Sequence, residues 1–166
     1  MKKKFRSPGK EWIFIFDVDG VLTDGKFTYT NEGKFSKTFG SHDSEALKEL
    51  SKISQISFIS ADSKGFDISS KRINDLGFEV HLVAANSRAN YLRKLQIDNR
   101  VVFTGDSFTD SRALDTANVS FAPKDAHSAA KKNATVTLRS KGGSGAVAEV
   151  CLLYLWALGK KFEVND

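Results

Sequence analysis

Short apolar segments alternate with segments of helical spacing through most of this 166-residue chain. Most of the apolar segments are rich in β-branched or aromatic residues, and several are bounded by Gly, Asn or Asp, which is typical of buried strands. The predicted strands are residues 12–16, 55–60, 78–84, 101–105, 118–122 and 134–138. The alternation predicts an α/β fold, a Rossmann-like three-layer sandwich with a mainly parallel sheet and helices on both faces.

Helical spacing of apolar residues fills the intervals between these strands. One predicted helix begins near Ser41 and Asp43, which are candidates for its N-cap, and another begins at Asn86 or Ser87. The last helix, residues 144–158, is almost wholly apolar and is expected to pack on the sheet or on another subunit.

Polar residues follow four of the predicted strands. Asp17 and Asp19 follow the first strand, Ser60 ends the second, Arg88 lies shortly after the third, and Asp106 follows the fourth. In parallel sheets of this kind, ligands bind at the carboxyl ends of the strands. We therefore expect these side chains to meet at one edge of the sheet.

Residues 24–39 interrupt the alternation with two runs of alternating polarity around an Asn-Glu-Gly turn, which predicts a β-hairpin. An isolated hairpin is marginal in water, and an exposed aromatic face is a liability. We expect the body of the domain or a neighbouring subunit to cover its aromatic residues, which are Phe27, Tyr29, Phe35 and Phe39.

The net charge of +5 comes from the start of the chain, because five basic residues lie in the first ten and the remainder balances the 20 acidic residues. We expect a basic flexible tail over residues 1–10 and a single domain over residues 11–166. Aromatic and basic residues are not interleaved elsewhere as a nucleic-acid-binding surface requires, so no nucleic-acid partner is expected.

No apolar run approaches the ~20 residues that cross a bilayer, and no apolar segment follows the charged start as in a signal peptide. Cys151 is the only cysteine, so an intrachain disulfide is impossible, which suits a reducing compartment. We expect a cytoplasmic protein with no membrane partner.

The acidic residues match the needs of phosphate-ester hydrolysis through an aspartyl-phosphate. That route needs a carboxylate nucleophile, a general acid, a hard cation and donors to the phosphoryl oxygens. Asp17 and Asp19 can approach one site in different roles, and the carboxylates of Asp106 and Asp110 suit Mg²⁺, which prefers oxygen ligands. Gly20 permits close approach of the backbone to phosphate.

The hydroxyl of Ser60 and the guanidinium of Arg88 can bind phosphoryl oxygens. Two acidic residues two positions apart are by themselves weak evidence for a phosphatase. Here the segment DVDGVLTDG follows a strong apolar strand, and a second acidic loop, GDSFTD, follows a later strand. The joint occurrence in this order indicates a phosphatase.

The segment FDVDGVLTDG resembles the first motif of the haloacid dehalogenase superfamily. More narrowly, the chain is similar to the small capless branch of 3-deoxy-D-manno-octulosonate 8-phosphate phosphatases. The likeness runs over most of the chain, because the hairpin with its NEGK turn and the segments SKRINDLGF, GDSFTD, PKDAHSAAKKNA and GGSGAVAEV follow in the family's order.

The resemblance implies that Asp17 is the nucleophile and Asp19 the general acid and base. It implies a Mg²⁺ ion held by Asp17, the backbone carbonyl of Asp19, and Asp106, with support from Asp110. Ser60 matches the phosphate-binding Ser/Thr of the family. No large cap domain is expected, and the relatives' assembly implies a homotetramer in which hairpins meet at the centre.

Several positions depart from the family pattern. Ser60-Ala61-Asp62 stands where the branch usually has Thr-Gly-Arg. Arg88 stands where a phosphate-binding lysine is expected, and Lys64 is an alternative for that role. Two further departures are Ser107, where a second acid is common, and Ala148, where relatives commonly carry Arg.

We therefore expect a cytosolic Mg²⁺-dependent phosphatase acting on a 2-keto-3-deoxy sugar acid phosphate, of the octulosonate 8-phosphate or nonulosonate 9-phosphate type. The altered positions lie on the side of the leaving group and leave its identity open. They also support the alternative of a catalytically weak binding or regulatory protein on the same scaffold. Nucleic-acid binding through the basic tail is a third, lesser alternative.

Overall fold

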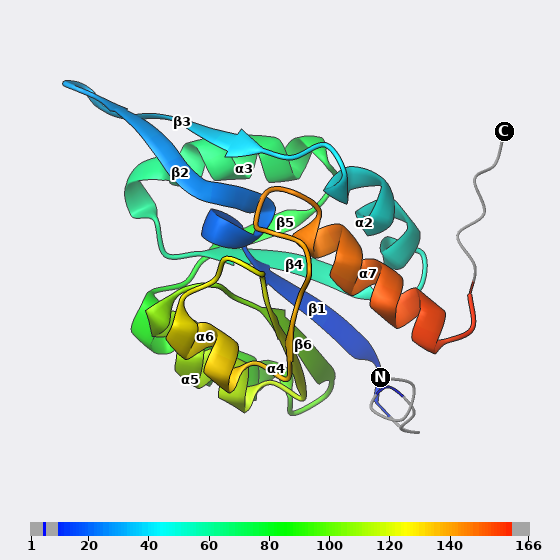
Figure 1. The fold of residues 1–166 in the computed structure, drawn as a ribbon. Coiled ribbons are helices and arrows are strands. Elements are labelled where there is room, and N and C mark those ends of the chain that lie inside the picture. The colour runs from blue at the N-terminus through cyan, green and yellow to red at the C-terminus, as the bar shows by residue number, and fades with distance from the viewer. Residues whose placement is uncertain (1–4, 6–9, 161–166) are drawn as a thin grey trace, which may run out of the picture.

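The computed structural model describes residue 5 and residues 10–160. Its centre is a six-stranded sheet with the order β5-β4-β1-β6-β7-β8, in which every neighbouring pair is parallel. The sheet confirms the predicted α/β architecture (Figure 1). Its strands are β1 (Trp12–Asp17), β4 (Gln55–Ser60), β5 (Glu79–Leu82), β6 (Arg100–Thr104), β7 (Val119–Ala122) and β8 (Val136–Thr137).

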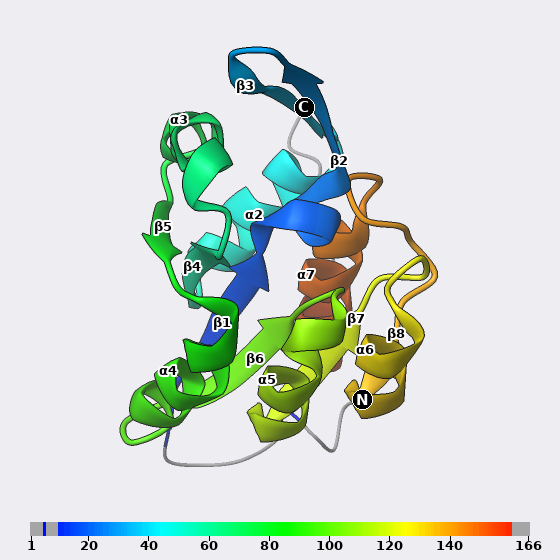
Figure 2. The same cartoon turned by 90° about the vertical axis from the view of Figure 1, so that its left-hand side faces the viewer.

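Helices cover both faces of the sheet, as the alternation predicts. The buried residues of α2, α3 and α7 pack with one face, and those of α4, α5 and α6 pack with the other (Figures 1 and 2). The helices are α2 (Asp43–Ser51), α3 (Phe66–Asp75), α4 (Arg88–Leu95), α5 (Ser111–Thr116), α6 (Ser128–Asn133) and α7 (Ala146–Ala157). Within the described residues, no inserted domain covers the sheet's carboxyl edge.

Strand β1 is buried along its whole length because it has helices on both faces. Phe14 and Phe16 point into the core beneath α2 and α7, and Ile13 and Ile15 point into the core beneath α4 and α5. Side chains alternate across a strand, so a strand covered on both sides must be apolar throughout. The apolar run that predicts β1 is thus the direct consequence of its central place.

The chain leaves β1 at a switch point of the sheet. β4 pairs with one side of β1 and β6 with the other, so the connection after β1 and the connection after β6 run toward opposite edges of the sheet. A crevice forms at such a point. Residues 18–22 make a short turn there (η1), in which Gly20 has a φ of 85°.

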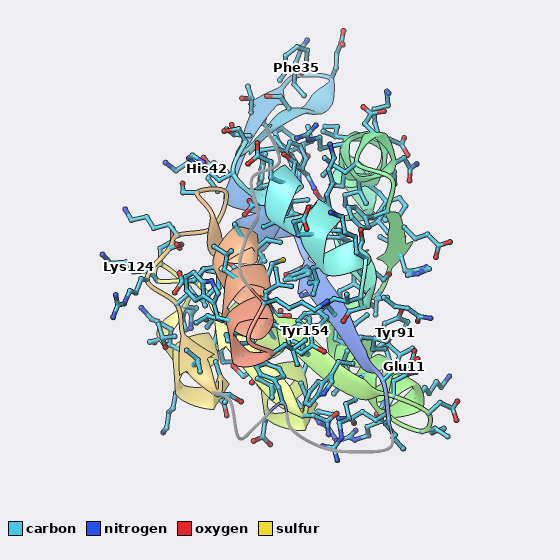
Figure 3. The ribbon with its side chains drawn as sticks, turned by 90° about the vertical axis from the view of Figure 1, so that its right-hand side faces the viewer. Glu11, Phe35, His42, Tyr91, Lys124 and Tyr154 are labelled. Atoms are coloured by element: carbon cyan, nitrogen blue, oxygen red, sulfur yellow. The ribbon has the colours of Figure 1, made fainter. Side chains whose placement is uncertain are left out.

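The predicted hairpin is present as β2 (Thr23–Thr30) and β3 (Gly33–Phe39), paired antiparallel and separate from the main sheet. It projects beyond the body of the domain, with Phe35 at its far end (Figures 1 and 3). Phe27, Tyr29 and Phe35 are 52%, 55% and 71% exposed, so the body of this chain does not cover them.

Several local expectations differ from the structure. β5 and β8 are shorter than predicted, and α7 begins two residues later than expected. Asp43 does not cap α2; its Oδ1 instead accepts a hydrogen bond of 2.8 Å from the backbone N–H of Ala148 at the start of α7. That contact joins residues 105 positions apart, which local sequence patterns do not reveal.

The basic tail at residues 1–10 lies mostly outside the described residues, so its flexibility stays a prediction. Phe5 is described: it is buried and stacks edge-on against Trp12 and Tyr154. Among the described helices, none combines the length and the apolar character that crossing a membrane requires.

Candidate active site

Asp17 is the last residue of the central strand, and it is 3% exposed. Its Oδ1 accepts a 2.8 Å hydrogen bond from the next backbone N–H, that of Val18, because the chain turns sharply after the strand. Burial and the nearby charge of Asp110 raise the pKa of Asp17 well above its usual value. The carboxylate therefore needs a cationic partner to remain ionised.

Arg88 supplies one such partner from the first position of α4. Its Nη1 lies 2.8 Å from Oδ2 of Asp17 and its Nη2 lies 2.9 Å from Oδ1, a bidentate pair, and Nη1 also donates to Asp110. Burial acts to lower the pKa of Arg88, but the two carboxylates outweigh it and raise the pKa. Arg88 and Asp17 thus meet at one edge of the sheet, as their places after the strands predict.

Asp110 shapes the loop that follows β6. Its Oδ2 accepts hydrogen bonds from the backbone N–H groups of Asp106, at 3.2 Å, and Ser107, at 2.9 Å. It also accepts one from the Ser107 hydroxyl at 2.6 Å. Ser107, at a position where a second acid is common, thus holds Asp110 in place by a capping box.

Carboxylate oxygens of Asp17, Asp106 and Asp110 all lie within 4.8 Å of one another, a spacing that suits a shared cation. Oδ1 of Asp106 is buried and finds no hydrogen-bond partner among the described residues. Burial and the charge of Asp110 raise the pKa of Asp106 to about 7. Three crowded oxygen ligands with an unused acceptor fit a hard divalent cation.

Gly20 leaves the space into which Asp106 points. A Cβ on Gly20 would lie 2.1 Å from Oδ2 of Asp106, and its positive φ also favours glycine. The carboxylate of Asp19 is not part of the cation cluster, so only its backbone carbonyl remains the expected ligand.

The carboxylate of Asp19 faces a second set of groups. It receives hydrogen bonds at Oδ2 from the Ser60 hydroxyl, at 3.2 Å, and from Nζ of Lys37, at 3.0 Å. The Ser60 oxygen in turn accepts a 3.1 Å bond from the backbone N–H of Asp62. Ser60 is fully buried at the end of β4, so in this structure its hydroxyl orients Asp19.

Two hairpin lysines and Asp62 complete this second set. Oδ2 of Asp62 lies 2.5 Å from Nζ of Lys34 and 2.8 Å from Nζ of Lys37. Burial acts to raise the pKa of Asp62, but the bonds from the two lysines outweigh it and lower the pKa to about 2. Neither lysine was identified from the sequence as a site residue. Asp62 could have indicated them, because it is an acid at a position where relatives carry a base, and a buried acid requires a cationic partner.

A cleft of about 380 Å³ lies between the cation cluster and the groups around Asp19. Ala61 and Arg88 line it, whereas Lys64, the alternative to Arg88, is exposed and is not among the lining residues. Lys34 brings a lysine to the cleft instead. The lining residues are Asp17, Asp19, Gly25, Phe27, Lys34, Ala61, Asp62, Arg88, Asp106, Ser107 and Thr109.

A larger hollow of about 870 Å³ lies at the opposite end of the sheet, near the amino ends of β1 and β4. None of the acids of the cation cluster lines it. We therefore place the site at the smaller cleft, where the acids converge.

The glycine-rich segment near the C-terminus supports the turn after β1. Gly143 donates a 3.0 Å backbone hydrogen bond to the carbonyl of Val21, and a Cβ on Gly142 would lie 2.0 Å from the carbonyl oxygen of Gly20. This close approach explains why glycines stand in that segment. Ala148, one of the departures, contributes the backbone N–H that binds Asp43.

Comparison with known proteins agrees with this geometry. No family model matches the sequence. The 3-deoxy-D-manno-octulosonate 8-phosphate phosphatase KdsC of Escherichia coli K12 is 32% identical over 159 residues, covering 92% of this chain and 84% of that protein. The KdsC of Yersinia pestis is 32% identical over 154 residues, covering 89% and 81%.

Solved structures show the same fold. The cobalt-bound deoxy-D-mannose-octulosonate 8-phosphate phosphatase of Haemophilus influenzae superposes with a TM-score of 0.80 at 30% identity, covering 96% of this chain and 92% of that one. A HAD superfamily (subfamily III A) hydrolase of Legionella pneumophila gives a TM-score of 0.78 at 27% identity, covering 95% and 86%.

The buried aspartate at the end of the central strand, the acidic cluster beside it and similarity across nine-tenths of the chain agree with one another. The chain belongs to the KdsC family of phosphatases in the haloacid dehalogenase superfamily.

Proposed function

We propose that this phosphatase is Mg²⁺-dependent, works through an aspartyl-phosphate on Asp17, and cleaves a 2-keto-3-deoxy sugar acid phosphate of the octulosonate 8-phosphate or nonulosonate 9-phosphate type. One observation carries the proposal. Asp17 and Asp19 both line the same cleft but have different neighbours. Asp17 belongs to the cation cluster, and Asp19 lies among the hairpin lysines.

In the first half of the reaction, an oxygen of Asp17 forms a bond to phosphorus and the bond from phosphorus to the leaving oxygen breaks. Asp19 gives its proton to that oxygen, so the sugar leaves as an alcohol. In the second half, water attacks phosphorus, gives a proton to Asp19, and displaces the Asp17 carboxylate. Inorganic phosphate leaves and both aspartates return to their first state.

Asp17, Asp106 and Asp110 would hold the divalent cation, with the backbone carbonyl of Asp19. When bound, the cation supplies positive charge that reduces repulsion between the aspartate nucleophile and the anionic phosphoryl group. Ligands made only of oxygen favour Mg²⁺. The cobalt-bound form of the Haemophilus influenzae relative supports the use of a divalent ion.

Arg88 would bind the phosphoryl oxygens. Its guanidinium pairs with the nucleophile and lines the cleft, so its charge lies beside the place where a phosphoryl group would meet Asp17. Gly20 leaves the backbone free to approach the same group. Ser60 and Ala61 lie at the neighbouring strand end, where Ala61 lines the cleft.

The similarity to 3-deoxy-D-manno-octulosonate 8-phosphate phosphatases supports a keto sugar acid phosphate as the substrate. Lys34, Asp62 and Phe27 line the part of the cleft beside Asp19, where a leaving group would lie. They offer a cation, an anion and an apolar ring to a polyhydroxylated acid, a combination that suits its carboxylate, hydroxyls and carbon chain.

The proposal is tested by measuring phosphate release from octulosonate 8-phosphate, nonulosonate 9-phosphate, hexose phosphates and nucleotides, with Mg²⁺ and with a chelator. We expect the two keto acid phosphates to give the highest kcat/KM, and the chelator to abolish turnover. Asp17→Asn should lower kcat by roughly 10⁴-fold or more, as loss of a covalent nucleophile does elsewhere. Full turnover by Asp17→Asn would sink the mechanism, and a preference for nucleotides would sink the substrate class.

We also propose that the protein assembles as a homotetramer through its hairpins. Phe27, Tyr29 and Phe35 present exposed aromatic rings on a projecting hairpin, which is typical of a contact surface. Light scattering at micromolar concentration should give four times the chain mass. Phe35→Asp should lower that mass, and a monomeric wild-type protein would contradict the assembly.

A further inference from the structure

Lys37 is a buried lysine on strand β3. Its side chain is 0% exposed, and the hairpin register pairs it with Phe27 of β2. Burial of an ammonium group is costly unless the group is paired and hydrogen-bonded. The partners of Lys37 therefore indicate what its charge does.

Three side chains accept the three N–H donors of this ammonium group. Nζ of Lys37 lies 2.7 Å from Oδ1 and 3.0 Å from Oδ2 of Asp19. It lies 2.8 Å from Oδ2 of Asp62 and 2.8 Å from the hydroxyl oxygen of Ser69. Lys37 does not line the cleft, so its charge acts on Asp19 rather than on a bound molecule.

The surrounding backbone is shaped to admit this lysine. A Cβ on Gly65 would lie 2.8 Å from Cε of Lys37, so a larger residue there would displace the lysine stem. Ser69 is fully buried in α3 and donates its own proton to the Gly65 carbonyl at 3.3 Å, which leaves its oxygen to accept from Lys37. The hairpin, the loop after β4 and α3 thus converge on one nitrogen.

We infer that Lys37 is a positioning residue for the acid–base group Asp19, an inference that rests on the proposed phosphatase mechanism. Contact of Lys37 with both carboxylate oxygens fixes the orientation of the Asp19 carboxyl group. The Asp19 side chain remains 31% exposed to solvent.

Proton transfer then creates a negative charge beside Lys37. As the bond from Asp17 to phosphorus forms and the bond to the leaving oxygen breaks, Asp19 releases its proton to that oxygen. The new carboxylate lies next to a preorganised ammonium group, which stabilises it where charge develops. Lys37 therefore contributes most when the leaving group is basic and needs that proton.

The test is a series of substituted phenyl phosphates, from p-nitrophenyl to phenyl, which have similar shapes and increasingly basic leaving groups. kcat/KM reports the steps through departure of the leaving group, so it isolates proton donation. In Lys37→Met, we expect the ratio of kcat/KM for p-nitrophenyl over phenyl phosphate to rise by about tenfold, because poorer acid catalysis makes the rate depend on leaving-group basicity.

Lys34→Met is the matched control, because Lys34 binds Asp62 but not Asp19. It removes one lysine from the same set and should shift all substrates by a common factor. Ser69→Ala removes one acceptor of Lys37 with little change in volume and should raise the ratio in the same direction. If Lys37→Met does not fold, Ser69→Ala still tests the inference. Thermal unfolding followed by circular dichroism shows whether each variant is folded.

An unchanged ratio in Lys37→Met, or in Ser69→Ala where Lys37→Met does not fold, overturns the inference, and so does an equal rise in Lys34→Met. Asp17→Asn separates this failure from failure of the proposed function. If Asp17→Asn is inactive and the ratio is unchanged, only the role of Lys37 falls. If Asp17→Asn retains turnover, the mechanism itself falls.

Discussion

Asp17 and Asp19 stand two residues apart, yet their carboxylates belong to regions of different construction. Asp17 is 3% exposed and meets groups at the carboxyl ends of the sheet strands and the helix that follows, namely Arg88, Asp106 and Asp110. The side chain of Asp19 is 31% exposed and meets a lysine from the hairpin. The sheet edge builds the nucleophile's surroundings, and the inserted hairpin builds those of the acid.

The difference also separates two tasks. The Asp17 region gathers three carboxylates around one unused acceptor, an arrangement that suits a cation and a phosphoryl group of any ester. The Asp19 region alternates lysines with acids, so its charges balance without an added ion. Changes in the first region should therefore affect every substrate, and loss of Lys37, which contacts Asp19 itself, should have an effect that depends on the leaving group.

The largest expected effect is in the Asp17 region. Gly20→Ala places a Cβ 2.1 Å from Oδ2 of Asp106, so the carboxylate must move. A displacement of about 1 Å at a reacting site costs about 100-fold in rate, and we expect at least that loss in kcat/KM for all substrates.

Gly77→Ala is the control for this change. Gly77 has a φ of 83°, close to the 85° of Gly20, but no atom lies within 4 Å of the position that a Cβ would take there. Both variants carry the same backbone strain, and only Gly20→Ala should lose activity and cation affinity. Equal activities in steady-state assays would show that the cation cluster does not depend on Gly20.

A smaller effect concerns cation affinity and pH. Burial and the charge of Asp110 raise the pKa of Asp106 to about 7, so a proton competes with the cation below that pH. Cation affinity should fall by up to about tenfold per pH unit as the pH drops from 7 to 5.5, because ligands must lose their protons to bind. Calorimetric titration with Mg²⁺ or Mn²⁺ measures it, and affinity independent of pH over this range would contradict the shared site.

The smallest effect tests the Asp19 region through stability. The lysine bonds outweigh burial and lower the pKa of Asp62 from 3.8 to about 2. Between these values the unfolded chain binds more protons than the native protein, so the contribution of Asp62 is present above about pH 4 and is lost as the pH falls toward 2. The urea midpoint at pH 5, 3.5 and 2.5 should therefore depend less on pH in Asp62→Asn than in the wild type.

Asp75→Asn is the matched control for that measurement, because Asp75 pairs with Lys71 on the exposed surface of α3. Exposed pairs of this kind contribute little to stability. If the urea midpoint had the same pH dependence in the wild type, Asp75→Asn and Asp62→Asn, the buried lysine network would not stabilise the fold.

The sheet and the Asp17 region follow from local patterns. The run WIFIF predicts a strand buried on both faces, and β1 is such a strand. Because parallel strands share one carboxyl edge, residues that follow different strands must meet there. Arg88 and Asp110, which are 22 positions apart, meet Asp17 for that reason.

The Asp19 region did not follow from local patterns. A lysine in a hairpin of alternating polarity is expected to face solvent, and nothing near Lys37 in sequence indicates burial. Its partners Asp19 and Ser69 lie 18 and 32 positions away, on a loop and a helix. Lys64, the expected alternative phosphate ligand, is exposed and lies outside the residues that line the cleft.

The sequence by itself determined the sheet, its helical layers, the hairpin and the aspartates at the strand ends, because periodicity and strand order are written in local residue types. The tertiary structure decided which charges pair around the hairpin: Lys34 with Asp62, and Lys37 with Asp19. A buried charge is stabilised by whatever opposite charge the fold brings within about 3 Å, and that distance depends on how the hairpin packs on α3.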